Sequence, residues 1–93
     1  MTIRQLSNNA IVVREDTGIL TLFSYESEVL RFNPWDRTMT VYTNTANYSK
    51  TTKKHVRMFC EHYIGVDVVE VSRAIFDPKK SYKDYKILHI INE

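Results

Sequence analysis

The chain has 93 residues, of which 43% are hydrophobic and 26% are charged, and this is the composition of one ordinary globular domain spanning residues 1–93. Its single cysteine, Cys60, excludes an intramolecular disulfide and with it a disulfide-stapled secreted scaffold. The net charge is +2, with the basic excess after residue 46, which permits an anionic partner without requiring one. No apolar stretch follows the N-terminus or reaches the roughly 20 residues that span a bilayer, so we expect a cytoplasmic protein that does not contact membranes.

Residues 10–43 carry the patterns of a four-stranded antiparallel meander. A β-branched run at 10–14 and a second apolar run at 19–25 flank the turn residues Asp16-Thr17-Gly18, which predicts a hairpin. Residues 29–32 predict a third strand, which must end at Pro34 because proline cannot continue a ladder. Residues 38–43 alternate with a period of two and predict the fourth strand.

A helix is predicted from about residue 50 to 64, behind a polar loop at 44–48. Ser49 or Thr51 can cap its N-terminus, and Gly65 stands where a left-handed C-terminal cap is expected. The helix is amphipathic, since four apolar residues fall within an arc of about 100° that must pack on the sheet. These residues are Val56, Phe59, Cys60 and Tyr63.

The last third of the chain predicts more sheet than helix. The valine-rich run 66–71 favours a further strand, and 73–76 allows a short helical turn before Asp77-Pro78 breaks the chain. Residues 79–84 are polar and expected to be exposed, and 86–91 predict a final strand. The fold class is therefore α+β, with an antiparallel sheet of about five to six strands and one amphipathic helix, about 50–64, packed on one face.

Four basic residues on the predicted helix form the main candidate binding site. They follow i, i+3, i+4, i+7 spacing and so share one face, roughly 120° from the centre of the apolar arc. They are Lys50, Lys53, Lys54 and Arg57. A solvated face that keeps the protein soluble explains such a run equally well. However, lysines in the first turns oppose the positive end of the helix dipole, which favours a contact surface for phosphates or for an acidic protein patch.

Two secondary candidates lie elsewhere. In the C-terminal segment, basic residues alternate with aromatic rings, as in proteins that hold single-stranded nucleic acid. This set comprises Lys79, Lys80, Tyr82, Lys83 and Tyr85, with Lys86 following. The alternative is an exposed loop with half-buried tyrosines. Trp35, next to Pro34, is a binding anchor if its turn is exposed, and a core residue otherwise.

The residues needed for catalysis or metal binding are not arranged in any known pattern. His55 and His62 are seven residues apart, and no histidine or cysteine pair has zinc-ligand spacing. Cys60 lies on the apolar arc, where a thiol is usually inert. With two glycines in the chain, no phosphate-cradling loop can form. We therefore expect no cofactor, no metal and no enzymatic activity.

Two segments resemble small phage and prophage proteins of unknown function. Residues 48–55, Tyr-Ser-Lys-Thr-Thr-Lys-Lys-His, are similar to a Tyr-Ser-x-Thr-Thr-x-x-His motif that opens a helix in those proteins. Residues 24–29, Ser-Tyr-Glu-Ser-Glu-Val, are similar to their upstream strand segment. The resemblance covers about residues 19–64, implies a phage accessory protein and carries over no catalytic residue. Within the motif, the hydroxyls of residues 49, 51 and 52 can satisfy free helix N–H groups, and His55 can return a hydrogen bond to the preceding strand or loop.

We therefore expect an interaction protein, by analogy with phage factors that counter host defences, such as anti-CRISPR inhibitors. Its partner would be a host protein, such as a nuclease or another nucleic-acid-processing complex, whose surface it occupies. Two alternatives remain open. One is a small nucleic-acid-binding module that uses the two lysine clusters, and the other is a virion or assembly component. A homodimer is compatible with each.

Overall fold

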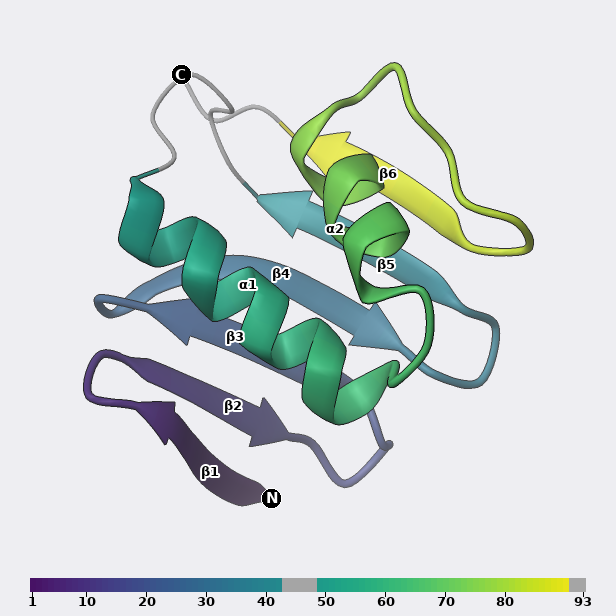
Figure 1. The fold of residues 1–93 in the computed structure, drawn as a ribbon. Coiled ribbons are helices and arrows are strands. Elements are labelled where there is room, and N and C mark those ends of the chain that lie inside the picture. Colours follow the sequence, from purple (N-terminus) through teal and green to yellow (C-terminus); the bar gives the residue numbers. More distant parts are fainter. Residues whose placement is uncertain (43–48, 91–93) are drawn as a thin grey trace.

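In the computed structural model, six strands form one sheet and two helices cover one of its faces (Figure 1). The structure describes residues 1–42 and 49–90. The strands are β1 (Thr2–Ser7), β2 (Ala10–Arg14), β3 (Leu20–Ser24), β4 (Ser27–Asn33), β5 (Thr38–Tyr42) and β6 (Lys86–Ile90). The helices are α1 (Lys50–Tyr63) and α2 (Val68–Phe76). The loop predicted at 44–48 lies outside the described residues.

The strands lie in the sheet in their sequence order, from β1 at one edge to β6 at the other. Each of the first five pairs antiparallel with the next, while β6 pairs parallel with β5. A parallel pair needs a crossover of a dozen or more residues, and α1 and α2 supply it. The predicted α+β class and the meander are confirmed, with one parallel pair at the end of the sheet.

The core lies between the helices and the sheet face that they cover. Leu22, Leu30 and Met39 from the sheet are completely buried, as are Phe59 of α1 and Ile75 of α2. The Phe59 ring meets Phe32 of β4 edge to face at 6.3 Å between centroids, a favourable arrangement for aromatic pairs. Both helices therefore share one core with the strands.

The predicted ends of α1 are confirmed. Ser49 is the N-cap, and its Oγ accepts a hydrogen bond from the backbone N–H of Thr52 at 3.0 Å. Gly65 has φ +77°, and its N–H donates to the carbonyl of Cys60 at 2.9 Å. Hydroxyl capping and a left-handed glycine thus set both ends of the helix.

The strand predicted at 66–71 is wrong, because this run opens α2, which makes two helices where one was expected. Val68, Val71 and Ile75 follow helical spacing, and packing this stripe against the core outweighs the preference of valine for strands. Strand β1 was not predicted at all, because its residues are mostly exposed and carry no apolar pattern. Neither described helix has the length and apolarity needed to cross a membrane.

Candidate functional site

The four basic residues predicted as a binding face all line one groove between α1 and α2. Lys50, Lys53, Lys54 and Arg57 stand on α1 with their side chains exposed. The cap at Ser49 fixes where the helix begins, and the i, i+3, i+4, i+7 spacing then aligns all four on the flank that faces α2. The apolar arc of α1 points into the core and holds this flank in place.

The opposite wall of the groove comes from α2. Its contributions are Val69, Ser72, Arg73 and Phe76, which repeat the i, i+3, i+4, i+7 spacing seen on α1. Because a strand was predicted at 66–71, this helical wall was not recognised, although its spacing was present in the sequence. Its regular period was the signal that could have revealed it.

The groove is strongly cationic. Five basic residues and no acidic residue are among the described residues that line it, and it encloses about 370 Å³. The Nζ of Lys53 lies 5.9 Å from the centroid of the Phe76 ring, a cation–π contact across the groove. Arg57 pairs with Glu61 one turn along α1 at 3.7 Å, between side chains that are more than half exposed. Such a surface pair is weak, so Arg57 remains available to a ligand.

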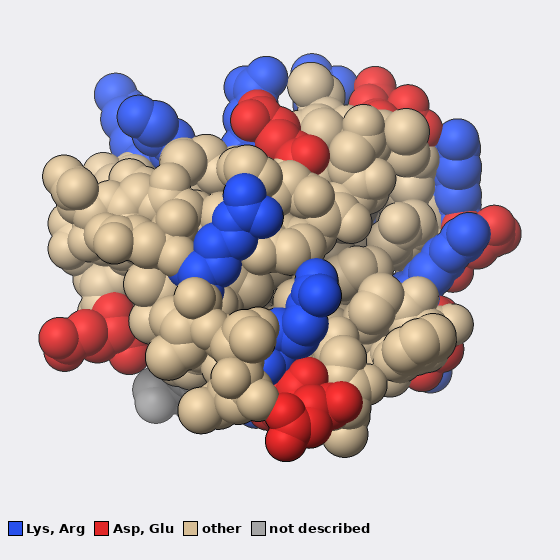
Figure 2. Space-filling model, turned by 90° about the horizontal axis from the view of Figure 1, so that it is seen from below, with Lys and Arg blue, Asp and Glu red and all other residues tan. Residues whose placement is uncertain are grey.

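This concentration of charge is not repeated on the side of the molecule where β1 lies. Seen from that side, most of the surface is uncharged, Lys and Arg side chains adjoin one another at the upper left edge, and the others stand apart or beside Asp and Glu (Figure 2). The mild positive charge of the protein is therefore concentrated by the fold, because two helical stripes far apart in sequence face one another.

At the base of the groove, Ser72 and Cys60 form a buried polar contact between the two helices. Ser72 is 7% exposed, and among the described residues its Oγ has no oxygen or nitrogen hydrogen-bond partner. Its neighbour is the thiol of Cys60, whose pKa is raised to about 11 mainly by burial. A buried thiol with a raised pKa is a poor nucleophile at neutral pH.

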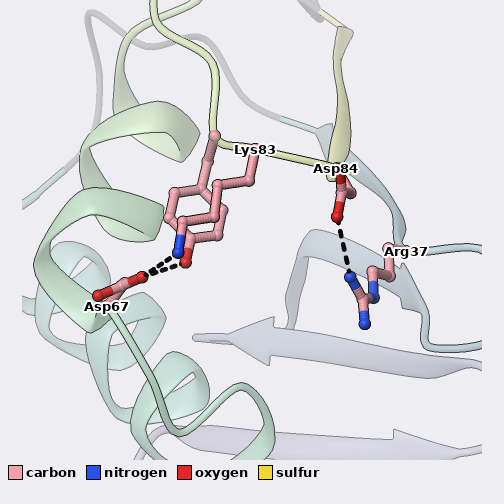
Figure 3. A network of polar contacts seen from close by, with 5 residues as sticks. Arg37, Asp67, Lys83 and Asp84 are labelled. Atoms are coloured by element: carbon pink, nitrogen blue, oxygen red, sulfur yellow. Dashed lines mark hydrogen bonds and ion pairs between the residues drawn. The ribbon is translucent and has the colours of Figure 1, made fainter.

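The secondary basic segment does not form an open stacking platform. Tyr82 is buried, and its hydroxyl donates to the Asp67 carboxylate, which also pairs with Lys83 Nζ at 3.0 Å (Figure 3). These contacts hold the pKa of Asp67 below its ordinary value, first through the Tyr82 hydrogen bond and then through Lys83. Asp67 is the N-cap residue of α2, with φ +49°, and its side chain makes no capping hydrogen bond. Its bonds to Tyr82 and Lys83 instead tie the loop after α2 back to the start of that helix. We call this contact of three residues the Asp67 clasp.

The other residues of the secondary basic segment do not share one surface. Tyr85 stacks on Phe32 at 6.0 Å between centroids, whereas Lys79 and Lys80 are exposed. Arg37 pairs with Asp84 at 3.4 Å between exposed side chains (Figure 3).

Trp35 is exposed, with 80% of its surface accessible, and lies over the turn between β2 and β3. Its Nε1 donates to the carbonyl of Thr17 at 3.1 Å, and a Cβ added to Gly18 would meet Nε1 at 2.9 Å. Trp35 therefore packs against Thr17 and Gly18 and does not line the α1–α2 groove.

A second polar cluster, for which the sequence predicted helix capping and a hydrogen bond from His55, lies where β3 meets α1. The Oγ of Ser24 and the Nδ1 of His55 are 2.7 Å apart, and Thr52 Oγ1 is 3.3 Å from the same Ser24 oxygen. His55 is buried, and the ring of Tyr25 lies 5.8 Å from it. In the described residues, no three His, Cys, Asp or Glu side chains come together as a set that could hold a metal ion.

These features define a small α+β protein that carries a cationic groove between two helices on one face of its sheet. Residues 1–78 match the family of unknown function DUF8033, and the chain belongs to this family. The match includes both walls of the groove and ends before most of the loop of the Asp67 clasp. No curated protein and no solved structure matches the chain.

Proposed function

We propose that this chain is a binding protein without catalytic turnover, whose α1–α2 groove takes an anionic surface of another macromolecule. One observation carries the proposal: five basic side chains from two helices line a single groove to which no described acidic residue contributes. Like charges gathered in this way repel one another and raise the local potential, which attracts anions and speeds their encounter.

The fold does not need this arrangement. Helix α1 has no acidic residue in its first turn and instead begins with Lys50, which the helix dipole disfavours. The cations of α1 are exposed and stand outside the apolar arc, so they contribute little to the core. A feature that costs stability without serving the fold supports a role in binding.

The reactive side chains support a role without chemistry. Cys60 is fully buried, with a raised pKa. The Ser24–His55 pair has the residue types of a nucleophile and its base, but His55 is 2% exposed and Ser24 3% exposed. A substrate could not reach either group without opening the core, whereas nucleophilic catalysis needs an accessible nucleophile and base.

The biological setting is part of the same proposal. The resemblance to phage proteins implies a host protein as the partner and inhibition by occupation as the effect. Nucleases and polymerases hold Mg²⁺ with carboxylates, and a cationic groove is complementary in charge to such a surface. We propose that the protein acts by covering an acidic surface of this kind.

Charge reversal at the groove tests the proposal. The triple variant Lys53→Glu, Lys54→Glu, Arg57→Glu is compared with a matched control that reverses three exposed lysines elsewhere, Lys79, Lys80 and Lys86. Both variants should keep the circular dichroism spectrum of the parent, since all six residues are exposed. Titration with polyglutamate, followed through backbone amide shifts, should lose most of its affinity in the groove variant and little in the control. Equal losses in both would mean that net charge alone, and no particular groove, attracts the anion.

A further inference from the structure

The two walls of the groove differ in chemistry. The α1 wall presents four basic side chains, whereas the α2 wall presents Val69, Phe76 and the base residue Ser72 beside one cation, Arg73. Val69 is 41% exposed, and Phe76 is half-buried under Lys53. An occupant that uses the whole groove must therefore offer negative charge to one side and apolar surface to the other.

A nucleic-acid backbone meets only half of this requirement. Its phosphates would pair with the lysines, but phosphates and sugars make no apolar contact with Val69, and a base could stack on Phe76 only by displacing Lys53 from that ring. A protein segment that mixes acidic and apolar side chains meets both, as in recognition modes where apolar anchors enter a groove between helices. Charge and apolarity together thus favour a peptide.

We propose that the groove binds a short acidic segment of a protein that inserts one or two apolar side chains against Val69 and Phe76. This inference rests on the proposed function and names the class of its partner. The volume of about 370 Å³ is near the lower end of the roughly 300–1,000 Å³ typical of ligand pockets. It has room for a few side chains of a short segment that a partner protein exposes on its surface.

The base of the groove adds a polar contact. Ser72 lines the groove with a buried hydroxyl that has no oxygen or nitrogen partner among the described residues. A buried hydroxyl without a hydrogen bond to oxygen or nitrogen is unfavourable, so a carboxylate that enters between the cations and reaches Ser72 would supply the missing partner. The acidic residue beside the apolar anchor is the group placed to accept this bond.

Three probes of similar charge distinguish the possible occupants. The first is a glutamate-rich peptide with a central leucine, the second has alanine in place of the leucine, and the third is an oligothymidylate. Each is titrated into the full chain by calorimetry at low salt, with amide shifts recorded in α1 and α2. We expect the leucine peptide to bind about tenfold more tightly than the alanine peptide, because the extra methyl and methylene groups are buried against α2.

The variant Val69→Ala tests the apolar wall, with Val66→Ala as its control because Val66 is also exposed and does not line the groove. Val69→Ala should remove most of the preference for leucine over alanine, and Val66→Ala should keep it. The inference is overturned if the two peptides bind equally, or if the oligothymidylate binds more tightly than both and Val69→Ala changes nothing. Should the groove charge reversal still abolish binding in that case, the anion-binding function would stand and only the peptide class would fail.

Discussion

The hydroxyl of Ser24 is hydrogen-bonded to Nδ1 of His55 at 2.7 Å and so joins the end of β3 to the second turn of α1. Around this bond, Thr52 and the capping Ser49 form a continuous chain of hydroxyls, with 3.0 Å between their oxygens. His55 is buried, and its pKa is lowered, first by that burial and then by the neighbouring charge of Lys54. The folded protein therefore favours the neutral imidazole.

This lowered pKa predicts how stability depends on pH. The unfolded chain binds a proton at His55 below about pH 6.5, whereas the folded chain resists it. The contribution of His55 to stability is thus complete above about pH 6.5 and is lost as the pH falls toward the folded-state pKa. We expect the melting temperature to decline as the pH is lowered below about 6.5.

The variant His55→Gln should flatten this decline, while His62→Gln, an exposed histidine on the same helix, should retain it. The comparison uses slopes against pH, so a general loss of stability in His55→Gln does not obscure it. A parental slope in His55→Gln would mean that other groups cause the pH dependence.

The same contact shows what the sequence could and could not predict around the site. Residues 24–29 and 48–55 were connected only through resemblance, and His55 was expected to hydrogen-bond to the preceding strand or loop. The bond goes to β3, however, and nothing in the spacing of the residues identifies which strand lies beneath α1. Local signals such as the Ser49 cap and the Gly65 terminus depend on a few adjacent residues and were therefore predictable.

The α2 wall of the groove shows the opposite case. Valine favours a strand on its own, and only the crossover to β6 and burial of Val71 and Ile75 make this segment a helix. Both causes are tertiary, and the helical period of these residues was the local signal that could have indicated them. The cationic stripe of α1 could be predicted, but the groove could not, because its second wall depends on the position of α2.

The packing of α1 predicts a large loss of stability on truncating its central aromatic residue. Phe59 is fully buried and contacts Phe32 and Tyr63 at 6.3 and 4.9 Å between centroids. Phe59→Ala should lower the free energy of unfolding by about 3–5 kcal/mol, because it removes apolar contacts and leaves a cavity. Urea denaturation measures this, with Val66→Ala as a control expected to change little since its side chain is 62% exposed. A parental midpoint for Phe59→Ala would contradict the packing of α1 on the sheet.

Two buried serines should respond to alanine in opposite ways. Ser24→Ala leaves Nδ1 of His55 without its partner, and we expect a loss of about 1–3 kcal/mol. Ser72→Ala removes an oxygen without a conventional partner, so stability should be unchanged or slightly raised. Ser72→Ala should nevertheless weaken binding of the acidic leucine peptide. Thermal melts and calorimetry on both variants check this pattern, and a destabilised Ser72→Ala would show that the contact with Cys60 is structural.

The Asp67 clasp predicts a change that depends on acid. Tyr82→Phe removes the hydroxyl that contributes most to the lowered pKa of Asp67, and Lys83 remains as the second partner. The pKa of Asp67, followed by NMR of its carboxyl carbon, should rise toward the ordinary value of about 3.9. A lowered carboxyl pKa stabilises the fold above that ordinary value, so Tyr82→Phe should melt below the parent at neutral pH and approach it in acid. Tyr85→Phe, whose ring stacks on Phe32, is the control and should leave the pKa of Asp67 unchanged.

A substitution at the first residue of α1 can separate the effect of the groove's positive charge on stability from its effect on binding. Lys50 stands in a first turn without acidic residues, where the helix dipole disfavours a positive charge. Lys50→Glu replaces that repulsion with attraction and adds an i, i+4 pairing with Lys54, so we expect the fold to gain about 0.5–1 kcal/mol. The same change removes one cation from the groove and should weaken binding of the acidic leucine peptide severalfold at low salt. Lys80→Glu makes an equal change in net charge outside the groove and should produce neither effect.

Chemical denaturation and calorimetry on the two variants therefore give a paired result. A gain in stability with no loss of affinity would assign Lys50 to the solvated surface, and a loss of stability would mean that this lysine supports the fold after all.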